Sequence, residues 1–178
     1  MLTILITSDH RSSREALARV LTAEPLFNVI AVCADAHAAM SITAQEQPDI
    51  VLIDGSSDPL MAIEATKKIL SGSGANVIAV TRHLEKGFAH HMLAAGALGY
   101  LTGQSPAAEI IAAVIAVAKD NVYLCEALRQ EDNILSLPTP VKTRFSFKQS
   151  VAAIRNSARR RIMEPAEIHW HGILQYTN

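Results

Sequence analysis

Short apolar runs alternate with amphipathic stretches along the first 125 residues of the chain. The apolar runs are four to seven residues long and rich in β-branched residues, which is typical of strands. After the first run, Leu17, Val20 and Leu21 recur at helical spacing, and later runs are followed in the same way. The pattern predicts five strands that alternate with five helices, the strands at residues 2–7, 27–33, 50–53, 76–80 and 98–101.

Residues between the runs predict where several helices begin and end. Ser12 and Glu15 have the spacing of a capping box, in which each satisfies a free backbone N–H at the helix start. Asp35 is suited to cap the second helix, and Ser105, which precedes a proline, the fifth. Gly96 is suited to end the fourth helix.

The alternation of strand and helix indicates an α/β fold with a parallel sheet, because parallel strands require crossover connections. Residues 50–53 show no polar alternation, so both faces of this strand should be covered by helices. We expect a doubly wound, flavodoxin-like sheet with the strand order 2-1-3-4-5. Strands two and five would then form its edges.

Polar residues follow three of the predicted strands: Asp9, Asp54 and Thr81. Parallel strands point their carboxyl ends to one rim, where ligands bind at the reversal of strand order. Two neighbouring carboxylates there favour a shared hard cation such as Mg²⁺, which can also neutralise a phosphoryl group moving onto a carboxylate. The simpler interpretation is that both acids are turn or cap residues.

These residues and their surroundings resemble the receiver domain of two-component response regulators over residues 1 to about 124. The matching features are Asp9-His10, Asp54, the sequence IEA at 63–65, the VIAVT run ending in Thr81, and AAGALGYL at 94–101. The Asp-His pair and DNVYL at 120–124 are most similar to the NarL/FixJ-type subgroup.

The resemblance implies a role for each matched residue. Asp54 corresponds to the phosphoryl acceptor, Asp9 to a Mg²⁺ ligand, and Ser56 to a metal ligand through its backbone carbonyl. Thr81 corresponds to the switch hydroxyl. Tyr100 corresponds to the aromatic residue that repacks with it and alters the face formed by helix 4, strand 5 and helix 5.

Two positions depart from the family pattern. Ser8 stands where a second acid is usual, and Gly103 where a lysine is usual. The two changes offset each other in charge, because the usual three carboxylates and one ammonium give −2, as do Asp9 and Asp54 alone. We expect Mg²⁺ binding to be weaker than usual. Arg82 either supplies a positive charge, covers the site, or is an ordinary solvated arginine.

The composition, 49% hydrophobic and 19% charged, is that of a globular protein. No apolar run approaches the ~18 residues that span a bilayer, and we expect a cytoplasmic protein that does not bind membranes. Cys33 and Cys125 lack metal or redox spacing and should be buried thiols.

The charge divides the chain into two parts, −4 for residues 1–125 and +3 for the rest. We expect a receiver domain at 1–125, a linker at 126–141 and a mostly helical basic extension at 142–178. No helix-turn-helix pattern is found in it. This extension could bind nucleic acid or dock on the acidic receiver of its own or a partner chain.

The sequence therefore predicts a response regulator, with a histidine kinase as phosphoryl donor to Asp54 and a homodimer as the expected assembly. Its only chemistry would be phosphoryl transfer to its own aspartate; metabolic activity is not expected. One alternative is a pseudo-receiver that acts as an interaction module without phosphate. Another is a flavin-binding enzyme on the same sheet, which Asp9 disfavours because it would repel a flavin phosphate.

Overall fold

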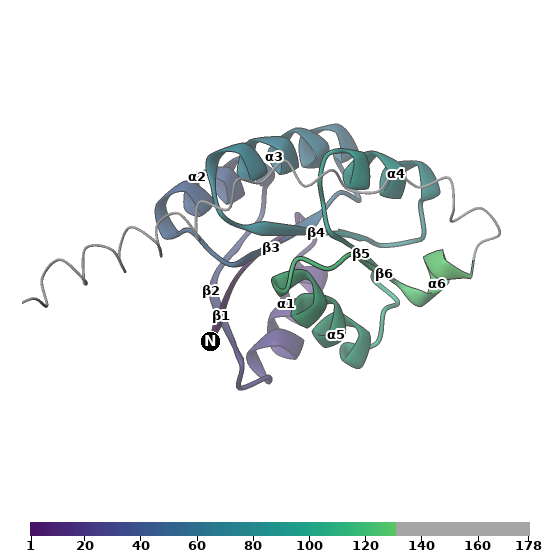
Figure 1. Cartoon of the computed structure of the whole chain (residues 1–178), viewed down its shortest axis with the longest axis horizontal. Helices are drawn as coiled ribbons and strands as arrows, with labels where there is room; N and C mark the ends of the chain where they lie inside the picture. Colours follow the sequence, from purple (N-terminus) through teal and green to yellow (C-terminus); the bar gives the residue numbers. More distant parts are fainter. Residues whose placement is uncertain (131–178) are drawn as a thin grey trace, which may run out of the picture. The chain divides into compact units, whose positions relative to one another are not determined.

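The computed structural model describes residues 1–130, and the predicted basic extension lies outside them, as does the linker from residue 131 onward. Strands and helices alternate along this part of the chain as the hydrophobic pattern predicts (Figure 1). The elements are β1 (Leu2–Thr7), α1 (Arg11–Thr22), β2 (Phe27–Cys33), α2 (Ala36–Glu46), β3 (Ile50–Asp54), α3 (Pro59–Gly72), β4 (Asn76–Thr81), α4 (Lys86–Ala94), β5 (Gly99–Thr102), α5 (Ala107–Ala118), β6 (Tyr123–Leu124) and α6 (Glu126–Arg129).

The strands form one sheet in the order β2-β1-β3-β4-β5-β6, and all neighbouring pairs are parallel. The predicted order 2-1-3-4-5 is confirmed, but the count of five is wrong because β6 adds a strand beside β5. Two residues are too few to show a period, so β6 forms through backbone pairing. Tyr123 N–H donates to Leu98 O (2.8 Å) and Cys125 N–H to Tyr100 O (2.9 Å).

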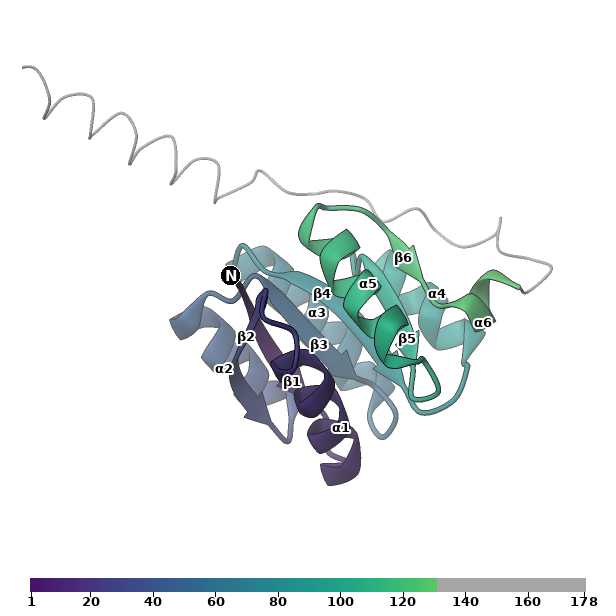
Figure 2. The ribbon, with the colours of Figure 1, turned by 90° about the horizontal axis from the view of Figure 1, so that it is seen from below.

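Helices cover both faces of the sheet: α2, α3 and α4 lie on one face, and α1 and α5 on the other (Figure 1). Residues Ile50–Ile53 of β3 are fully buried between the two layers, as their continuous apolar pattern predicts. Figure 2 shows β6 beside β5, followed by the short helix α6 within the predicted linker. The β5 strand is thus internal, and β6 forms the edge.

The helix ends test the predicted caps. The Asp35 side chain accepts from Ala38 N–H (2.8 Å), and Gly96 has a positive φ of 102° in a Schellman motif after α4. The predicted capping box of Ser12 and Glu15 is wrong, because α1 begins at Arg11 and Ser12 lies inside its first turn. Ser105 is also not the cap of α5; its hydroxyl accepts from Thr102 N–H instead.

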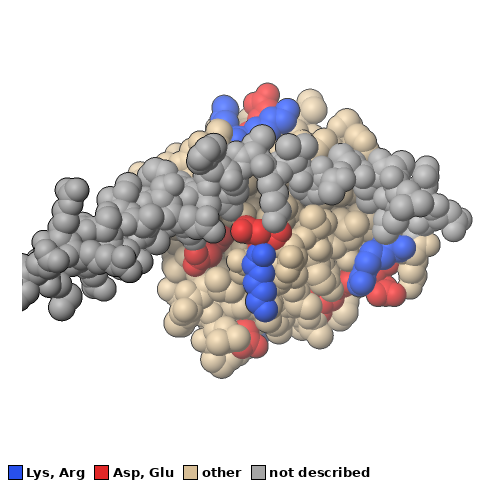
Figure 3. Space-filling view, viewed as in Figure 1, with Lys and Arg blue, Asp and Glu red and all other residues tan. Residues whose placement is uncertain are grey.

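Charged side chains of both signs occur close together on the face seen in Figure 3. One such group joins α5 to α6: Arg129 lies 3.2 Å from Glu126 and 4.0 Å from Glu109. Within residues 1–130, no helix is both long and apolar enough to cross a membrane. Cys33 is half-buried and Cys125 buried, and both are free thiols.

Candidate functional site

Asp54 is the last residue of β3 and lies half-buried at the carboxyl rim of the sheet. Its Oδ2 accepts a hydrogen bond from the Ser8 hydroxyl (2.6 Å). Its Oδ1 accepts from both the backbone N–H (2.8 Å) and the hydroxyl (2.5 Å) of Ser56. Three donors therefore fix the orientation of this carboxylate, and an incoming group must displace or rearrange one of them.

Ser8 connects this carboxylate to the loop after β1. Its side chain is buried, and its hydroxyl oxygen also accepts from the backbone N–H of His10 (3.2 Å). The Ser8 carbonyl accepts from the guanidinium of Arg14 (2.6 Å), which anchors the loop to α1. Residue 8 thus contributes a neutral donor that binds Asp54 directly.

Asp9 lies at the same rim and is exposed. Its Oδ1 is 3.4 Å from Nε2 of His10, and that nitrogen is also 3.2 Å from the Ser57 hydroxyl. The Arg82 guanidinium contacts the same nitrogen. Since a guanidinium can only donate, Nε2 of His10 would be the acceptor in this contact.

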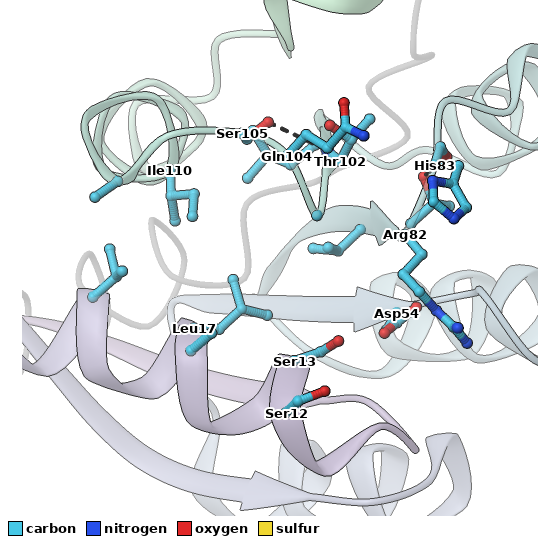
Figure 4. A pocket seen from close by; sticks show the side chains of 17 residues that line it. Ser12, Ser13, Leu17, Asp54, Arg82, His83, Thr102, Gln104, Ser105 and Ile110 are labelled. Carbon is cyan, nitrogen blue, oxygen red and sulfur yellow. Dashed lines mark hydrogen bonds between the residues drawn. The ribbon is translucent and has the colours of Figure 1, made fainter.

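Arg82 spans the rim beside Asp54 (Figure 4). Its backbone N–H donates to the Ser56 hydroxyl (2.9 Å), while its guanidinium contacts His10. Of the three roles considered for this arginine, covering the site agrees best with this position. Ser56 meanwhile bridges Asp54 to the end of β4 through its side chain.

Thr81 and Tyr100 form a buried hydrogen-bonded pair on β4 and β5. Their hydroxyl oxygens are 2.8 Å apart, and the Thr81 hydroxyl also donates to His83 O (2.7 Å). The phenol oxygen accepts from Glu85 N–H (3.1 Å), so the pair reaches the start of α4. Burial raises the pKa of Tyr100, and the hydrogen bond with Thr81 partly opposes this.

Packing connects Asp54 to the same tyrosine by a second route. A Cβ atom on Gly55 would lie 2.1 Å from Cζ of Phe88, so the ring of Phe88 packs directly on the backbone that follows Asp54. The rings of Phe88 and Tyr100 have centroids 6.5 Å apart. A movement of the loop after β3 would therefore be transmitted to α4 through Phe88, and from Phe88 to Tyr100.

Comparison with known proteins identifies the family. The family described as "Response regulator receiver domain" matches residues 4–115, more than half of the chain. The chain belongs to the response regulator receiver family. The resemblance inferred from Asp9, Asp54, Thr81 and their neighbours is thus confirmed at the level of the family.

Relatives of this receiver include named transcriptional regulators. The chain is 31% identical to "Transcriptional regulatory protein DegU" of Brevibacillus brevis, covering 68% of the chain and 52% of that protein. It is 33% identical to "Transcriptional regulatory protein LiaR" of Bacillus subtilis, covering 67% and 57%. The chain thus matches only about half the length of these two relatives.

Solved structures agree with the family and the fold. A two-component response regulator of the LuxR family from Aurantimonas matches with a TM-score of 0.68 and 32% identity, covering 74% of this chain and 94% of that one. The receiver domain of the response regulator NarL from Mycobacterium tuberculosis matches with a TM-score of 0.58 and 26% identity, covering 66% and 96%.

Within this receiver, the structure places the predicted residues at three separate points. Asp54 and Ser56 are bonded to each other, Thr81 and Tyr100 form a second pair, and Asp9 contacts His10. Among residues 1–130, no group of three or more His, Cys, Asp and Glu side chains is arranged to hold a metal ion. The assignment of Asp9, Asp54 and the Ser56 carbonyl as Mg²⁺ ligands therefore stays a prediction.

Two contributions were missed by sequence reasoning. The hydroxyl of Ser56 was not predicted to act, because the family resemblance assigns only its backbone. The ring of Phe88 was not singled out, although an apolar residue early in a helix next to a glycine-containing loop is a weak signal of such packing. The departure at Ser8 did point to the altered pocket, but not to the bond with Asp54.

Proposed function

We propose that this chain is a response regulator whose receiver accepts a phosphoryl group from a histidine kinase on Asp54. The observation that carries the proposal is the position of this carboxylate at the rim of a receiver fold, in packing contact with the Thr81–Tyr100 pair through Phe88. The bond formed is between a carboxylate oxygen and phosphorus, and the donor's phosphohistidine bond breaks.

Mg²⁺ is the expected cofactor, and the donor chemistry fits it. The groups that would hold it are the carboxylates of Asp9 and Asp54 and the carbonyl of Ser56, all oxygen donors of the kind this cation prefers. When bound, the ion would neutralise negative charge that accumulates during phosphoryl transfer. Ser8 takes the place of one usual anionic donor, which favours a lower affinity.

The residues of the chain have separate tasks in this scheme. Ser8 and Ser56 orient the carboxylate, and one of their bonds must break to free an attacking oxygen. The Thr81 hydroxyl would exchange its bond with His83 O for one to the phosphoryl group. Because Thr81 also bonds Tyr100, this exchange would loosen the phenol and change the face formed by α4, β5 and α5.

The output would be a change in self-association or in transcription. The names of two relatives are those of transcriptional regulators, which supports a transcriptional output. Homodimerisation is the change that the family resemblance suggests for the α4-β5-α5 face. The basic extension beyond residue 141 is the candidate nucleic-acid-binding segment, since it holds most of the positive charge of the chain's second part.

Labelling with acetyl phosphate tests the proposal. We expect the intact mass of the full chain to increase by one phosphoryl group in the presence of Mg²⁺. The mass should not increase when EDTA is added before acetyl phosphate. Asp54→Asn should abolish the gain. Asp58→Asn is the matched control, because Asp58 lies four positions on, caps α3 by accepting from Met61 N–H, and Asn caps equally well.

The pseudo-receiver alternative makes the opposite prediction. It predicts that the mass of the parent chain does not increase with Mg²⁺ and acetyl phosphate, under conditions that label an intact receiver from another protein. Equal labelling of the parent and Asp54→Asn would also contradict the proposed acceptor, because another side chain would then carry the phosphoryl group.

A further inference from the structure

Arg82 and Asp54 line one cavity of about 480 Å³, beside the carboxyl ends of β4 and β5 (Figure 4). Within residues 1–130, no other Lys, Arg, Asp or Glu side chain lines this cavity. Asp9 lies at the same rim but contacts His10 and does not belong to the lining. A group attached to Asp54 would therefore enter a space to which Arg82 brings the positive charge.

The backbone of Arg82 is anchored next to the acceptor, while its charged end is bonded elsewhere. Its N–H donates to the Ser56 hydroxyl (2.9 Å), which in turn donates to Asp54 (2.5 Å). Asp54 has three hydrogen bonds from Ser8 and Ser56, and none of them involves the guanidinium. The exposed guanidinium contacts His10 instead. The resting carboxylate is thus satisfied without Arg82.

Phosphorylation would add negative charge to this space. A carboxylate carries one negative charge, whereas a phosphoryl group on a side chain carries about −1.5 to −2 at neutral pH. The charges of Asp9, Arg14 and Glu109 on the surrounding segments are the same before and after the transfer. Arg14 is bonded to a backbone carbonyl in the loop after β1 (2.6 Å), and Glu109 accepts from the first N–H of α6 (2.6 Å). The guanidinium of Arg82 is the group in the cavity lining that can respond to the added charge.

Position 103, where the family has a lysine, is in contact with the backbone of Arg82. A Cβ atom on Gly103 would lie 3.3 Å from the carbonyl oxygen of Arg82 and 3.5 Å from its Cα. The Gly103 N–H donates to Thr81 O (2.6 Å), which joins the ends of the two strands. The positive charge that is missing at position 103 is therefore present on the adjacent strand end. A guanidinium there can bind two phosphoryl oxygens at once, which an ammonium group does not do.

We propose that Arg82 is the residue that binds the phosphoryl group on Asp54. In the unphosphorylated chain its guanidinium covers the acceptor and contacts His10. After the transfer it leaves His10 and donates two parallel hydrogen bonds to phosphoryl oxygens. Covering the site and binding the phosphoryl group are thus successive positions of one side chain. This role rests on the proposed function, because it requires Asp54 to be the acceptor.

Titration of the full chain with beryllofluoride at constant Mg²⁺ tests this role, because beryllofluoride mimics a phosphoryl group on a carboxylate. The backbone amide NMR signals of Ser56 and Thr81 report the affinity. Arg82→Gln should weaken binding at least about ten-fold, because a hydrogen bond between charged groups is lost. Arg82→Lys should weaken it less, since the charge remains and only the two-pronged geometry is lost. Arg19→Gln removes the same charge from the last turn of α1, away from the rim, and should leave the affinity unchanged.

Two further measurements separate phosphoryl binding from a purely structural role of Arg82. Gly103→Lys, added to Arg82→Gln, returns a positive charge to the adjacent position and should restore most of the lost affinity. Gly103→Ala in the same background adds the Cβ atom without a charge and should restore none. In the parent chain, beryllofluoride should also shift the ring signals of His10, because the guanidinium leaves Nε2. In Arg82→Gln that shift should be much smaller.

The outcomes distinguish this role from the proposed function itself. If the parent chain shows no saturable binding, or if Asp54→Asn leaves binding unchanged, the acceptor assignment and the role of Arg82 are both wrong. If Asp54→Asn abolishes binding while Arg82→Gln and Arg19→Gln bind equally well, only the role of Arg82 is wrong. Equal recovery by Gly103→Lys and Gly103→Ala would likewise overturn it, because packing and not charge would then explain the loss.

Discussion

The pocket around Asp54 and the Thr81–Tyr100 pair differ in how far they follow the receiver pattern. The pocket has Ser8 and Gly103 where the family pattern has an acid and a lysine. The hydroxyl groups of Ser8 and Ser56 both donate hydrogen bonds to the half-exposed carboxylate of Asp54. The pair keeps both family residues and is buried at 1% and 0% exposure. The proposed phosphoryl-accepting end of this receiver thus departs from the family pattern, while the pair proposed to respond to it does not.

This contrast has an energetic basis. Tyr100 belongs to the hydrophobic core, so a change there alters packing and hydrogen bonds that are shielded from water. Residues at the rim exchange their hydrogen bonds with solvent at small cost. Substitutions at the pocket should therefore act mainly on ligand and metal binding, and those at the pair mainly on stability and on signal transmission.

The largest expected effect is at Gly55, where the two regions meet. Gly55→Ala should lower the free energy of unfolding by about 2–3 kcal/mol, because the new Cβ would lie 2.1 Å from Phe88 Cζ and force the ring and α4 to move. Chemical denaturation measures this loss, and NMR of the Tyr100 ring reports the displacement.

Gly87→Ala is the matched control, because a Cβ there meets nothing within 4 Å and the residue lies in α4. It should be neutral or stabilise by up to about 1 kcal/mol, since alanine favours helix. Equal stability of the two variants would show that the Phe88 ring does not pack tightly on Gly55. Phe88 would then not connect the Asp54 pocket to the Thr81–Tyr100 pair.

A second effect of about 2 kcal/mol is expected from Ser8→Asp, which restores an acid to the pocket. The new carboxylate would replace a hydroxyl 2.6 Å from Asp54 Oδ2 and repel it, so the variant should be less stable without a divalent cation. Mg²⁺ should recover the loss and raise the melting temperature more than in the parent chain, as thermal unfolding with and without Mg²⁺ would show.

Ser8→Ala serves as the control for this change. It removes the same hydrogen bond but adds no charge, so it should cost about 1 kcal/mol and gain no more stability from Mg²⁺ than the parent chain does. If Ser8→Asp responds to Mg²⁺ no more than Ser8→Ala, the rim does not bind the cation through residues 8, 9 and 54.

The smallest effect is expected from Tyr100→Phe, which keeps the ring but removes the hydroxyl that bonds Thr81 and Glu85 N–H. The cost should be about 1 kcal/mol by chemical denaturation. Tyr123→Phe provides a control at a half-buried tyrosine on β6. A smaller cost for Tyr100 than for Tyr123 would contradict a tightly held switch pair.

The same variant should change the response to alkaline pH. Burial raises the pKa of Tyr100 above its ordinary value of 10.0, so the unfolded chain loses this proton first. The contribution of Tyr100 to stability is therefore complete below pH 10 and is lost as the pH rises through the higher pKa of the folded state. Tyr100→Phe should lose less stability over that range than the parent chain does.

The main outline of the fold could be predicted from sequence because the strands β1 to β5 are each built around a short apolar run. Capping was less predictable, since a serine at the right spacing has several possible partners. Ser12 lies inside the first turn of α1 while Glu15 pairs with Arg11 instead, at 2.7 Å. Ser105 bonds the end of β5. Such choices depend on neighbours that local spacing does not reveal.

In the candidate site, too, the positions of residues could be predicted from sequence but their long-range contacts could not. The positions of Asp54, Thr81 and Tyr100 follow from the ends of strands and from family motifs. The hydrogen bonds of Ser8 and the contact between Arg82 and His10 join residues up to 72 positions apart, and no local pattern encodes them.

Cys125, between β6 and α6, gives the chain a built-in chemical reporter. Its thiol is buried, and burial raises its pKa, so it should react slowly with alkylating reagents. Its backbone N–H is bonded to the carbonyl of Tyr100, so separation of β6 from β5 would expose the sulfur. The half-buried Cys33 on β2 offers an internal reference. The ratio of the alkylation rate of Cys125 to that of Cys33 would measure how frequently β6 separates from β5.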